Sequence, residues 1–175
     1  MALYEFEGKR PKVDASAFVF DSADVIGDVA IGPRCYVGPG ARLRGDYGSI
    51  EVGEASAVED NCVVHARPGE RCSIGKNVTI GHGAILHNCT IKDWAIVGMG
   101  AVVSDYAVVG EEATVGEGAV VKNKQEIPAR AIAVGIPAKV IGQVTDGYLA
   151  QWRGFKGIYA SLAEKRCRSG LRKVG

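Results

Sequence analysis

Histidine is the side chain whose number and spacing point most directly to chemistry in this sequence. The 175-residue chain has three histidines, His65, His82 and His87, and all of them fall in one short stretch. Neutral imidazole is a common ligand of divalent metal ions. Three imidazoles leave one coordination position open for water, which is the arrangement of a catalytic zinc site. Whether these three meet depends on the elements that carry them.

Those elements follow a six-residue repeat. An aliphatic residue recurs every sixth position, a small residue comes four positions later, and a glycine often follows the aliphatic residue directly. Each hexapeptide is expected to form one short strand and one corner, so that three make a triangular coil of a parallel β-helix. Glycine is expected to supply backbone freedom near the corners. The alternative, a β-sandwich, requires turn clusters every 8–12 residues. The aliphatic positions are Val13, Val19, Val25, Ile31, Val37, Leu43, Val52, Val58, Val64, Ile74, Ile80, Leu86, Ile91, Val97, Val103, Val109, Val115 and Val121.

The pattern changes near the C-terminus. Residues 126–141 are predicted to leave the repeat because Pro128 and Pro137 cannot donate to a strand ladder. From Thr145, a predicted N-cap, apolar residues recur at helical spacing. The sequence therefore predicts a β-helix domain over 1–144. Residues 145–175 are predicted to form a C-terminal helix and a basic tail that pack on it.

Composition narrows the classes of function. A formal net charge of +1 gives no field that favours nucleic acid or an anionic membrane. The five cysteines are odd in number and form no CxxC pair, which disfavours a disulfide framework or a thiolate zinc site. With no apolar run of about 20 residues and no leader-like start, a cytoplasmic location is expected.

The repeat also places the histidines. The aliphatic rhythm is interrupted between Leu43 and Val52 and between Val64 and Ile74, and it slips by one residue between Leu86 and Ile91. If four extra residues before Ile74 form a loop, His65 and His87 lie on one face of the prism, one coil spacing of about 4.8 Å apart. If the first interruption holds three extra residues, Arg44 lies one coil before His65 on the same face. His82 falls near a corner of the preceding face. Its ring is expected to reach the same ion only from a neighbouring molecule, in a homotrimer with three shared metal sites.

At these residues the sequence resembles the γ-class carbonic anhydrases and their relatives, including carnitine-operon, phenylacetate-operon and ferripyochelin-binding proteins. The resemblance covers almost the whole chain. It includes LRGD at 43–46, EDN at 59–61, VVH at 63–65, IGHGAILH at 80–87, IVGMGAVV at 96–103 and VGIPAKV at 134–140. It implies that the β-helix is left-handed and trimeric, and that the three histidines bind Zn²⁺, or alternatively Fe²⁺ or Co²⁺.

The resemblance also implies roles for other residues. Arg44 and Asp46 match a pair that bridges subunits and anchors bicarbonate, and Asp60 matches the acidic member of a Gln-Asp pair. Glu59 stands where the family has Gln, and its charge disfavours an anionic product. Tyr159 matches an active-site tyrosine. The loop at 66–73 is short and lacks the acidic insertion of the family's best-known members.

Three functions remain open from the sequence. The first is reversible hydration of CO2 to bicarbonate by metal-bound hydroxide, as in a carbonic anhydrase-like lyase. The second is acyl chemistry, either a hexapeptide acyltransferase that uses a histidine base or hydrolysis of an acyl-CoA thioester by the same metal site. The third is a catalytically weak metal-binding trimer.

Overall fold

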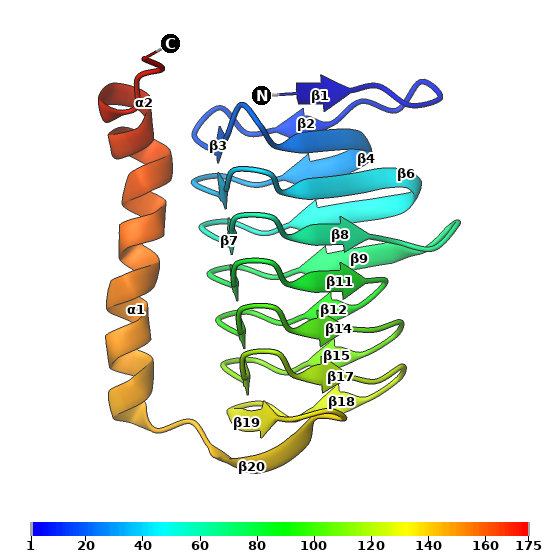
Figure 1. The fold of residues 1–175 in the computed structure, drawn as a ribbon, viewed down its shortest axis with the longest axis vertical. Helices are drawn as coiled ribbons and strands as arrows, with labels where there is room; N and C mark the ends of the chain where they lie inside the picture. Colours follow the sequence, from blue (N-terminus) through cyan, green and yellow to red (C-terminus); the bar gives the residue numbers. More distant parts are fainter. Residues whose placement is uncertain (1, 175) are drawn as a thin grey trace.

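A computed structural model describes residues 2–174. Within them the chain forms a parallel β-helix of short strands and ends in a helix that stands beside it (Figure 1). The strands are β1 (Ala2–Tyr4), β2 (Lys12–Val13), β3 (Phe18–Val19), β4 (Asp24–Ile31), β5 (Tyr36–Val37), β6 (Arg42–Val52), β7 (Ala57–Val58), β8 (Val63–His65), β9 (Arg71–Ile74), β10 (Thr79–Ile80), β11 (Ile85–His87), β12 (Thr90–Ile91), β13 (Ile96–Val97), β14 (Val102–Val103), β15 (Val108–Val109), β16 (Thr114–Val115), β17 (Val120–Val121), β18 (Glu126–Ile127), β19 (Ala131–Val134) and β20 (Lys139–Gln143).

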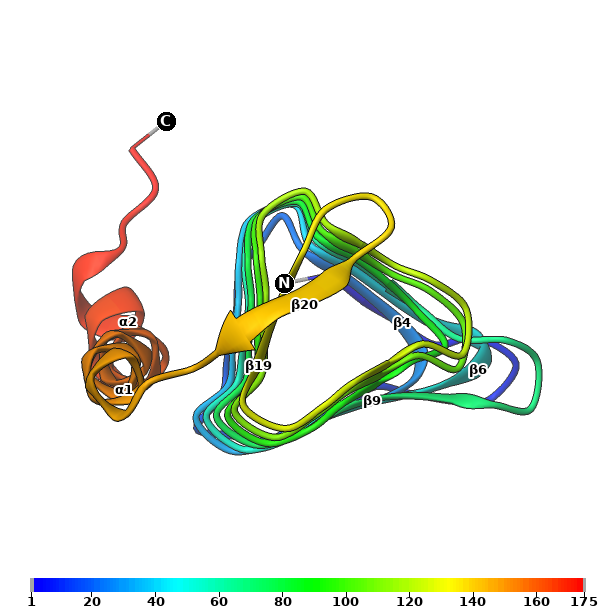
Figure 2. The ribbon, with the colours of Figure 1, turned by 90° about the horizontal axis from the view of Figure 1, so that it is seen from below.

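The coils stack into a triangular prism (Figure 2). One face is the ladder β20-β19-β16-β13-β10-β7-β5-β3. The other two faces form one continuous sheet, because β6 bends around an edge and pairs with β8 through its first part and with β9 through its last. With the N-terminus uppermost, β8, β11 and β14 cross the near side from left to right as the chain descends, which is a left-handed coil. The predicted left-handed parallel β-helix is confirmed.

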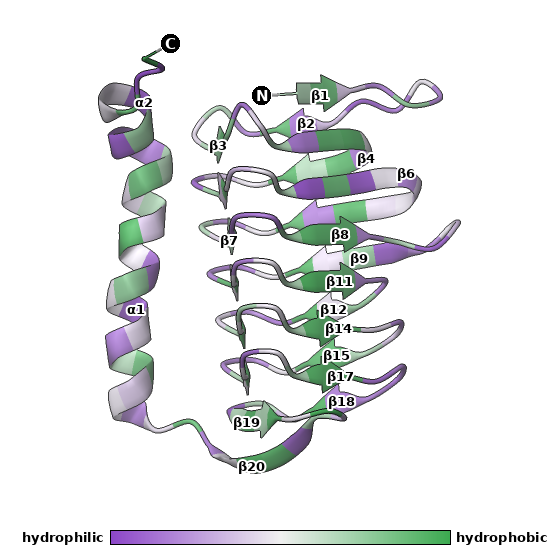
Figure 3. Ribbon diagram, in the orientation of Figure 1, coloured by the Kyte–Doolittle hydropathy of each residue, from purple (hydrophilic) through white to green (hydrophobic). Residues whose placement is uncertain are grey.

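The interior is filled as the repeat predicts. Leu43, Val64, Leu86 and Val103 are register partners in successive coils, and all four are fully buried. Strands such as β8, β11, β14 and β17 are apolar, whereas β6, β9 and the C-terminal helix are mixed (Figure 3). Each buried aliphatic side chain contributes roughly 1.5–3 kcal/mol relative to exposure, so the column is a main source of stability.

The predicted reason for glycine after the aliphatic residue is wrong. Left-handed backbone at one corner falls on Gly40, Asn61, Gly83, Gly100 and Gly118, so glycine does supply backbone freedom there, but these are not the glycines that follow the aliphatic residue. Gly98, which follows an aliphatic residue, has no left-handed φ. A Cβ there would lie 2.6 Å from the backbone nitrogen of Glu117 in the next coil. Close approach of stacked backbones, and not conformational freedom, selects glycine at this place.

The prediction that 126–141 leaves the repeat is also wrong over its first part. Strand β18 pairs in parallel with β15, and β19 pairs with β16, so the ladders continue through Val134. Ile127 is buried like the earlier aliphatic residues. Pro128 is tolerated because its position on this face has no following coil whose carbonyl would need a backbone N–H. The parallel ladder ends at β20, which turns back antiparallel to β19.

The C-terminal helix runs back along the prism. It starts beside β20, at the C-terminal end of the prism, and ends beside the first coils, at the N-terminal end of the prism (Figure 1). It consists of α1 (Asp146–Ser161), a π-helical turn η1 (Leu162–Arg166) and α2 (Cys167–Gly170). The Thr145 hydroxyl accepts the Tyr148 backbone N–H at 3.2 Å, which confirms the predicted N-cap. Leu149, Lys156 and Ala163 are buried toward the prism. No helix among residues 2–174 is long and apolar enough to cross a membrane.

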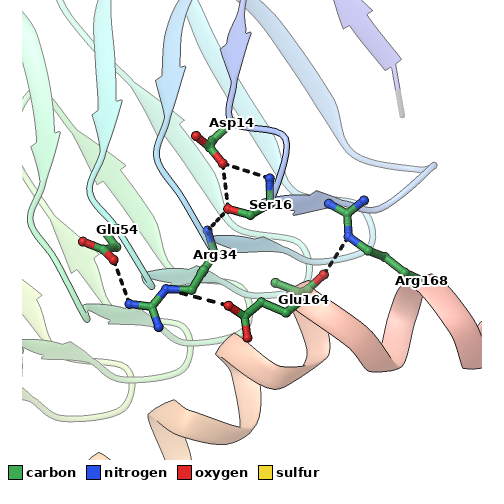
Figure 4. A network of polar contacts seen from close by, with 7 residues as sticks. Asp14, Ser16, Arg34, Glu54, Glu164 and Arg168 are labelled. Carbon is green, nitrogen blue, oxygen red and sulfur yellow. Dashed lines mark hydrogen bonds and ion pairs between the residues drawn. The ribbon is translucent and has the colours of Figure 1, made fainter.

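Ion pairs fix the far end of this helix to the first coils (Figure 4). Arg34 binds Glu54 at 2.7 Å on the prism and lies 3.9 Å from Glu164 on η1. Its backbone N–H donates to the Ser16 hydroxyl. Arg168 donates to the backbone carbonyls of Ala15 and Ala17. The helix is therefore held at both ends, which fixes the position of the side chains between them.

Candidate functional site

His65 and His87 form a close pair on one face of the prism. They are direct register partners on β8 and β11, as the repeat predicts. Nδ1 of His65 lies 3.2 Å from Nε2 of His87, and the ring centroids are 5.2 Å apart. Two nitrogens that each lie about 2.0–2.1 Å from a tetrahedral zinc ion are separated by about 3.3 Å. The pair therefore has the spacing of two ligands of one ion.

Carboxylates hold the outer nitrogens of this pair. Asp46 Oδ1 lies 2.8 Å from Nε2 of His65, and Asp105 Oδ1 contacts Nδ1 of His87. Burial alone would raise the pKa of Asp46. The hydrogen bond from His65 and the charge of Arg44 outweigh it, so this pKa lies below its usual value. Burial likewise opposes ionisation of Asp105, but hydrogen bonds from Arg67 and His87 lower its pKa.

The carboxylate contacts assign the imidazole protons. An ionised carboxylate only accepts, so in the neutral imidazoles the protons are assigned to Nε2 of His65 and Nδ1 of His87. The two nitrogens that face each other then both present lone pairs at 3.2 Å. Such an arrangement repels unless a cation lies between them, and carboxylate–histidine pairs of this kind are the usual outer partners of metal ligands.

Two arginines complete this side of the site. Arg44 is the register partner of His65 one coil earlier, as predicted. Its guanidinium lies 3.3 Å from Asp46 and 3.4 Å from Nε2 of His65. Arg67, from the loop after β8, binds the second oxygen of Asp105 at 2.7 Å. Within one chain, Arg44 and Asp46 therefore pair with each other.

His82 lies at a corner and belongs to a different cluster. Its Nε2 is 3.0 Å from Glu59 and its Nδ1 is 3.2 Å from Asp60. Tyr159 on α1 donates to Glu59; burial, and then this hydrogen bond, raise the Tyr159 pKa. The structure thus brings together Glu59, Asp60, His82 and Tyr159. Within residues 2–174 of one chain, no group of three His, Cys, Asp or Glu side chains is placed to hold a metal ion.

A cavity of about 500 Å³ opens beside His82, between α1 and the face that carries β10, β13 and β16. Most of its wall is aliphatic or aromatic, and its polar residues include Glu59 and His82. The lining residues are Glu59, Thr79, Gly81, His82, Ile96, Val97, Gly98, Met99, Thr114, Val115, Glu117, Tyr148, Trp152, Phe155, Ile158, Tyr159 and Leu162.

Asp105 and Arg67 are residues of the site that sequence reasoning missed. Asp105 lies 18 residues after His87, but this coil is one residue short, since Leu86 pairs with Val103. The repeat therefore places Ser104 opposite His87 and Asp105 one position further on, so the count alone does not identify Asp105 as the partner. Arg67 lies in an inserted loop whose path the repeat does not determine.

The fold and these residues define a class: a hexapeptide-repeat β-helix protein with a histidine–carboxylate site on its outer surface. Residues 71–105 match the family described as bacterial transferase hexapeptide (six repeats). The chain is 45% identical over 171 residues to the carnitine operon protein CaiE of Salmonella newport (strain SL254), covering 98% of this chain and 86% of that protein. It therefore belongs to the hexapeptide-repeat family that includes CaiE.

Solved structures agree with this assignment. A hexapeptide transferase family protein from Anaplasma phagocytophilum superposes with a TM-score of 0.90 at 36% identity, covering 97% of this chain and 98% of that one. The product of the BC4754 gene of Bacillus cereus gives a TM-score of 0.91 at 33% identity, covering 93% and 95%. Both matches include the C-terminal part of the chain as well as the prism.

Proposed function

We propose that this protein is a γ-carbonic anhydrase-like metalloenzyme that interconverts CO2 and bicarbonate at sites shared between subunits of a homotrimer. The observation that carries the proposal is the His65–His87 pair, whose facing nitrogens both present lone pairs at the separation expected of two ligands. His82 of an adjacent subunit would be the third ligand. The metal would be Zn²⁺, with Fe²⁺ and Co²⁺ as alternatives, because all three suit imidazole ligands.

Residues around the histidine pair would orient the metal ligands and attract the anion. When bound, a divalent ion with three imidazole ligands supplies hydroxide near neutral pH by lowering the pKa of water. Asp46 and Asp105 orient His65 and His87 and hold them in the required tautomers. Arg44, 3.3 Å from Asp46, carries a positive charge beside the pair that favours the bicarbonate anion.

Glu59 and Tyr159 would act on the other side of the site. Tyr159 donates to Glu59, which also contacts His82, so the helix is linked to the third ligand through one carboxylate. As an ionised carboxylate, Glu59 accepts a hydrogen bond from water but does not donate one to an oxygen of CO2 or bicarbonate. We expect the charge of this side chain to disfavour formation of the bicarbonate anion at the site and to weaken its binding there.

The experiment that tests the proposal combines metal analysis with stopped-flow CO2 hydration. Protein purified without chelator is expected to contain about one zinc, iron or cobalt ion per chain, and the His87→Ala variant is expected to lose both ion and activity. The matched control is Glu51→Ala, since Glu51 pairs with Arg71 on the prism surface and contacts no histidine. Metal without CO2 hydration would support a catalytically weak metal-binding trimer, and protein without metal would contradict the proposal.

Hexapeptide acyltransferase activity is the second candidate, favoured by the matched family's description. That chemistry requires a histidine that is free to act as a base. In this chain the nitrogens of His65 and His87 that contact no carboxylate face each other at 3.2 Å, and both ring nitrogens of His82 contact carboxylates, Glu59 and Asp60. Transfer of an acetyl group from acetyl-CoA, retained in His87→Ala, would favour this candidate over the metalloenzyme.

A further inference from the structure

The cavity beside His82 is larger than a CO2 molecule requires. Its volume of about 500 Å³ falls in the range of sites that enclose organic ligands, roughly 300–1,000 Å³. Trp152, Phe155 and Ile158 on α1 face Ile96 and Met99 on the prism across it. This composition, mainly apolar walls with a few polar groups, is typical of a pocket for the hydrocarbon part of a ligand.

One polar atom in the apolar wall lacks a partner. Thr79 and Thr114 occupy the same column of the ladder, two coils apart, through the register partners of β13. The Thr79 hydroxyl is satisfied by Lys156 Nζ at 3.2 Å. The Thr114 side chain is nine-tenths buried, and its oxygen is the buried side-chain polar atom without a hydrogen-bond partner in residues 2–174. Buried hydroxyls are normally paired, so this one points to a ligand that brings a polar atom to the wall.

The charge at the other end of the cavity restricts the ligand further. Glu59 is buried and lies where the cavity meets His82. A free carboxylate placed there would meet a like charge, whereas a neutral carbonyl group would not. The ligand that fits both ends has a neutral acyl carbonyl near His82 and an apolar chain along the groove. A hydrogen-bonding group on that chain lies about 10 Å away, two coil spacings of roughly 4.8 Å.

We propose that this cavity binds the medium-length acyl chain of a thioester or ester, which makes the site a hydrolase for a substrate much larger than CO2. In this reaction the oxygen of water adds to the acyl carbon, the bond from that carbon to sulfur or oxygen breaks, and the leaving thiol or alcohol takes the proton. The hydrolytic step rests on the proposed metal site, whereas the binding of the acyl chain does not.

Binding is tested with octanamide, a neutral analogue that is not readily hydrolysed, titrated by calorimetry into the full-length metal-loaded protein. Ile96→Trp and Met99→Trp are expected to fill the groove and to weaken binding at least tenfold. Met99 is half exposed, so its replacement does not disturb the core. The matched control is Val140→Trp, because Val140 is equally exposed on β20 and does not line the cavity. Absence of saturable binding, or equal affinity in the groove variants, would overturn the proposal.

The Thr114 contact is tested with 8-hydroxyoctanamide. We expect it to bind the wild type more tightly than octanamide, and Thr114→Val to remove that difference of about tenfold, the size of one hydrogen bond. Thr90→Val is the control, because Thr90 lies on β12 in a different sheet. A difference that persists in Thr114→Val would overturn the assignment of this hydroxyl.

Metal content, CO2 hydration and hydrolysis of octanoyl-CoA against acetyl-CoA, measured on the same preparations, separate the two proposals. His87→Ala is expected to lose metal and all hydrolysis but to bind octanamide as the wild type does. If the wild type hydrates CO2 but does not bind octanamide, the acyl site is ruled out and the metalloenzyme is not. If the wild type binds octanamide but contains no metal, the acyl-chain site is supported and the proposed metalloenzyme is ruled out. Faster hydrolysis of acetyl-CoA than of octanoyl-CoA would contradict the chain-length assignment.

Discussion

The two halves of the proposed metal site are held in very different ways. His65 and His87 sit in adjacent rungs of one ladder, and each has a buried or nearly buried carboxylate behind it. His82 sits at a corner, its side chain is 46% exposed, and Glu59 and Asp60 both contact its ring. The first half is positioned by the backbone ladder within one chain. The second half depends on side-chain contacts and on a helix that packs from outside.

This difference shows which part of the site the fold alone provides. A ladder fixes the separation of two outward side chains to one coil spacing, so the histidine pair needs only outer carboxylates to set its tautomers. A third ligand from the same chain would have to reach around an edge of the prism. We therefore propose that the third ligand comes from another subunit, and each prediction below tests one side of that division.

The largest effect is expected from removing each half of the site in a separate variant. His82→Ala and the double variant His65→Ala/His87→Ala should each reduce the rate of CO2 hydration by more than about 100-fold. This exceeds the loss of about 10–100-fold that is typical when a residue hydrogen-bonded to a metal ligand is replaced. When the two variants are mixed in equal amounts and reassembled, about a quarter of the wild-type sites should be recovered. A site is complete only where the His82→Ala chain supplies the histidine pair and the other variant supplies His82, which occurs at one interface in four.

The measurement is metal content and stopped-flow CO2 hydration of the mixture before and after reassembly. Reassembled wild type is the control for losses during the procedure. If mixing recovers neither metal nor activity although both variants reassemble, the site is contained within single chains and the division into two halves is wrong.

The next effect concerns the carboxylate behind His87. Asp105→Asn removes the charge that accepts from Nδ1 of His87 and from Arg67. Metal affinity is expected to fall by about 10–100-fold, as for other outer partners of metal-bound histidine. Titration with a competing chelator measures it. Glu51→Gln is the matched control, since Glu51 pairs with Arg71 on the prism surface and contacts neither histidine. An unchanged affinity would mean that the ladder alone orients His87.

The ladder half is also the part that sequence could predict. The six-residue period placed Arg44, His65 and His87 in one column, and the structure pairs them in that register. The same count reaches only the neighbourhood of Asp105, because the coil after His87 is one residue short and sets Ser104 opposite it. Periodicity succeeds here because parallel coils repeat the same backbone geometry, so position in sequence translates directly into position on a face.

Elsewhere the period carried less information. The segment at 126–141 was predicted to end the coils because proline breaks ladders, but Pro128 lies where no further coil requires its N–H. The cavity beside His82 arises from the packing of α1 against the prism, and helical periodicity fixes neither the direction of the helix nor its distance from the sheet. Arg67 is reached through a loop that has no repeat at all.

A moderate effect is expected on the His82 side. Glu59→Gln keeps the shape of the side chain that contacts His82 and removes its negative charge. Formation of bicarbonate should become several-fold faster and inhibition by added bicarbonate stronger, because the anion no longer lies beside a like charge. The measurement is kcat for CO2 hydration together with inhibition by added bicarbonate. Glu117→Gln, at another part of the cavity wall, is the control. A slower reaction in Glu59→Gln would show that this carboxylate assists the chemistry.

The smallest effect tests how α1 is attached beside His82. Lys156 is buried against the prism, where its Nζ contacts the Thr79 hydroxyl and the carbonyls of Asn77 and Ala95. Burial lowers the Lys156 pKa to about 7, against an opposing effect of Glu59. Between this value and the usual lysine pKa near 10.5, the unfolded chain binds a proton that the folded chain does not. Stability contributed by this group therefore rises with pH across that window, by at most about 1.4 kcal/mol per unit, and is constant below it.

The difference in free energy of unfolding between wild type and Lys156→Met isolates this contribution, because tyrosine and cysteine titrations in the same range cancel between the two proteins. Urea unfolding at several pH values from 6 to 10, at fixed protein concentration, should show that difference growing in favour of the wild type above pH 7. Lys139→Met, at an exposed position on β20, should show no such trend. A flat difference would mean that the three oxygen contacts keep Lys156 charged. The helix would then be anchored by an ammonium group, as firmly at pH 6 as at pH 9.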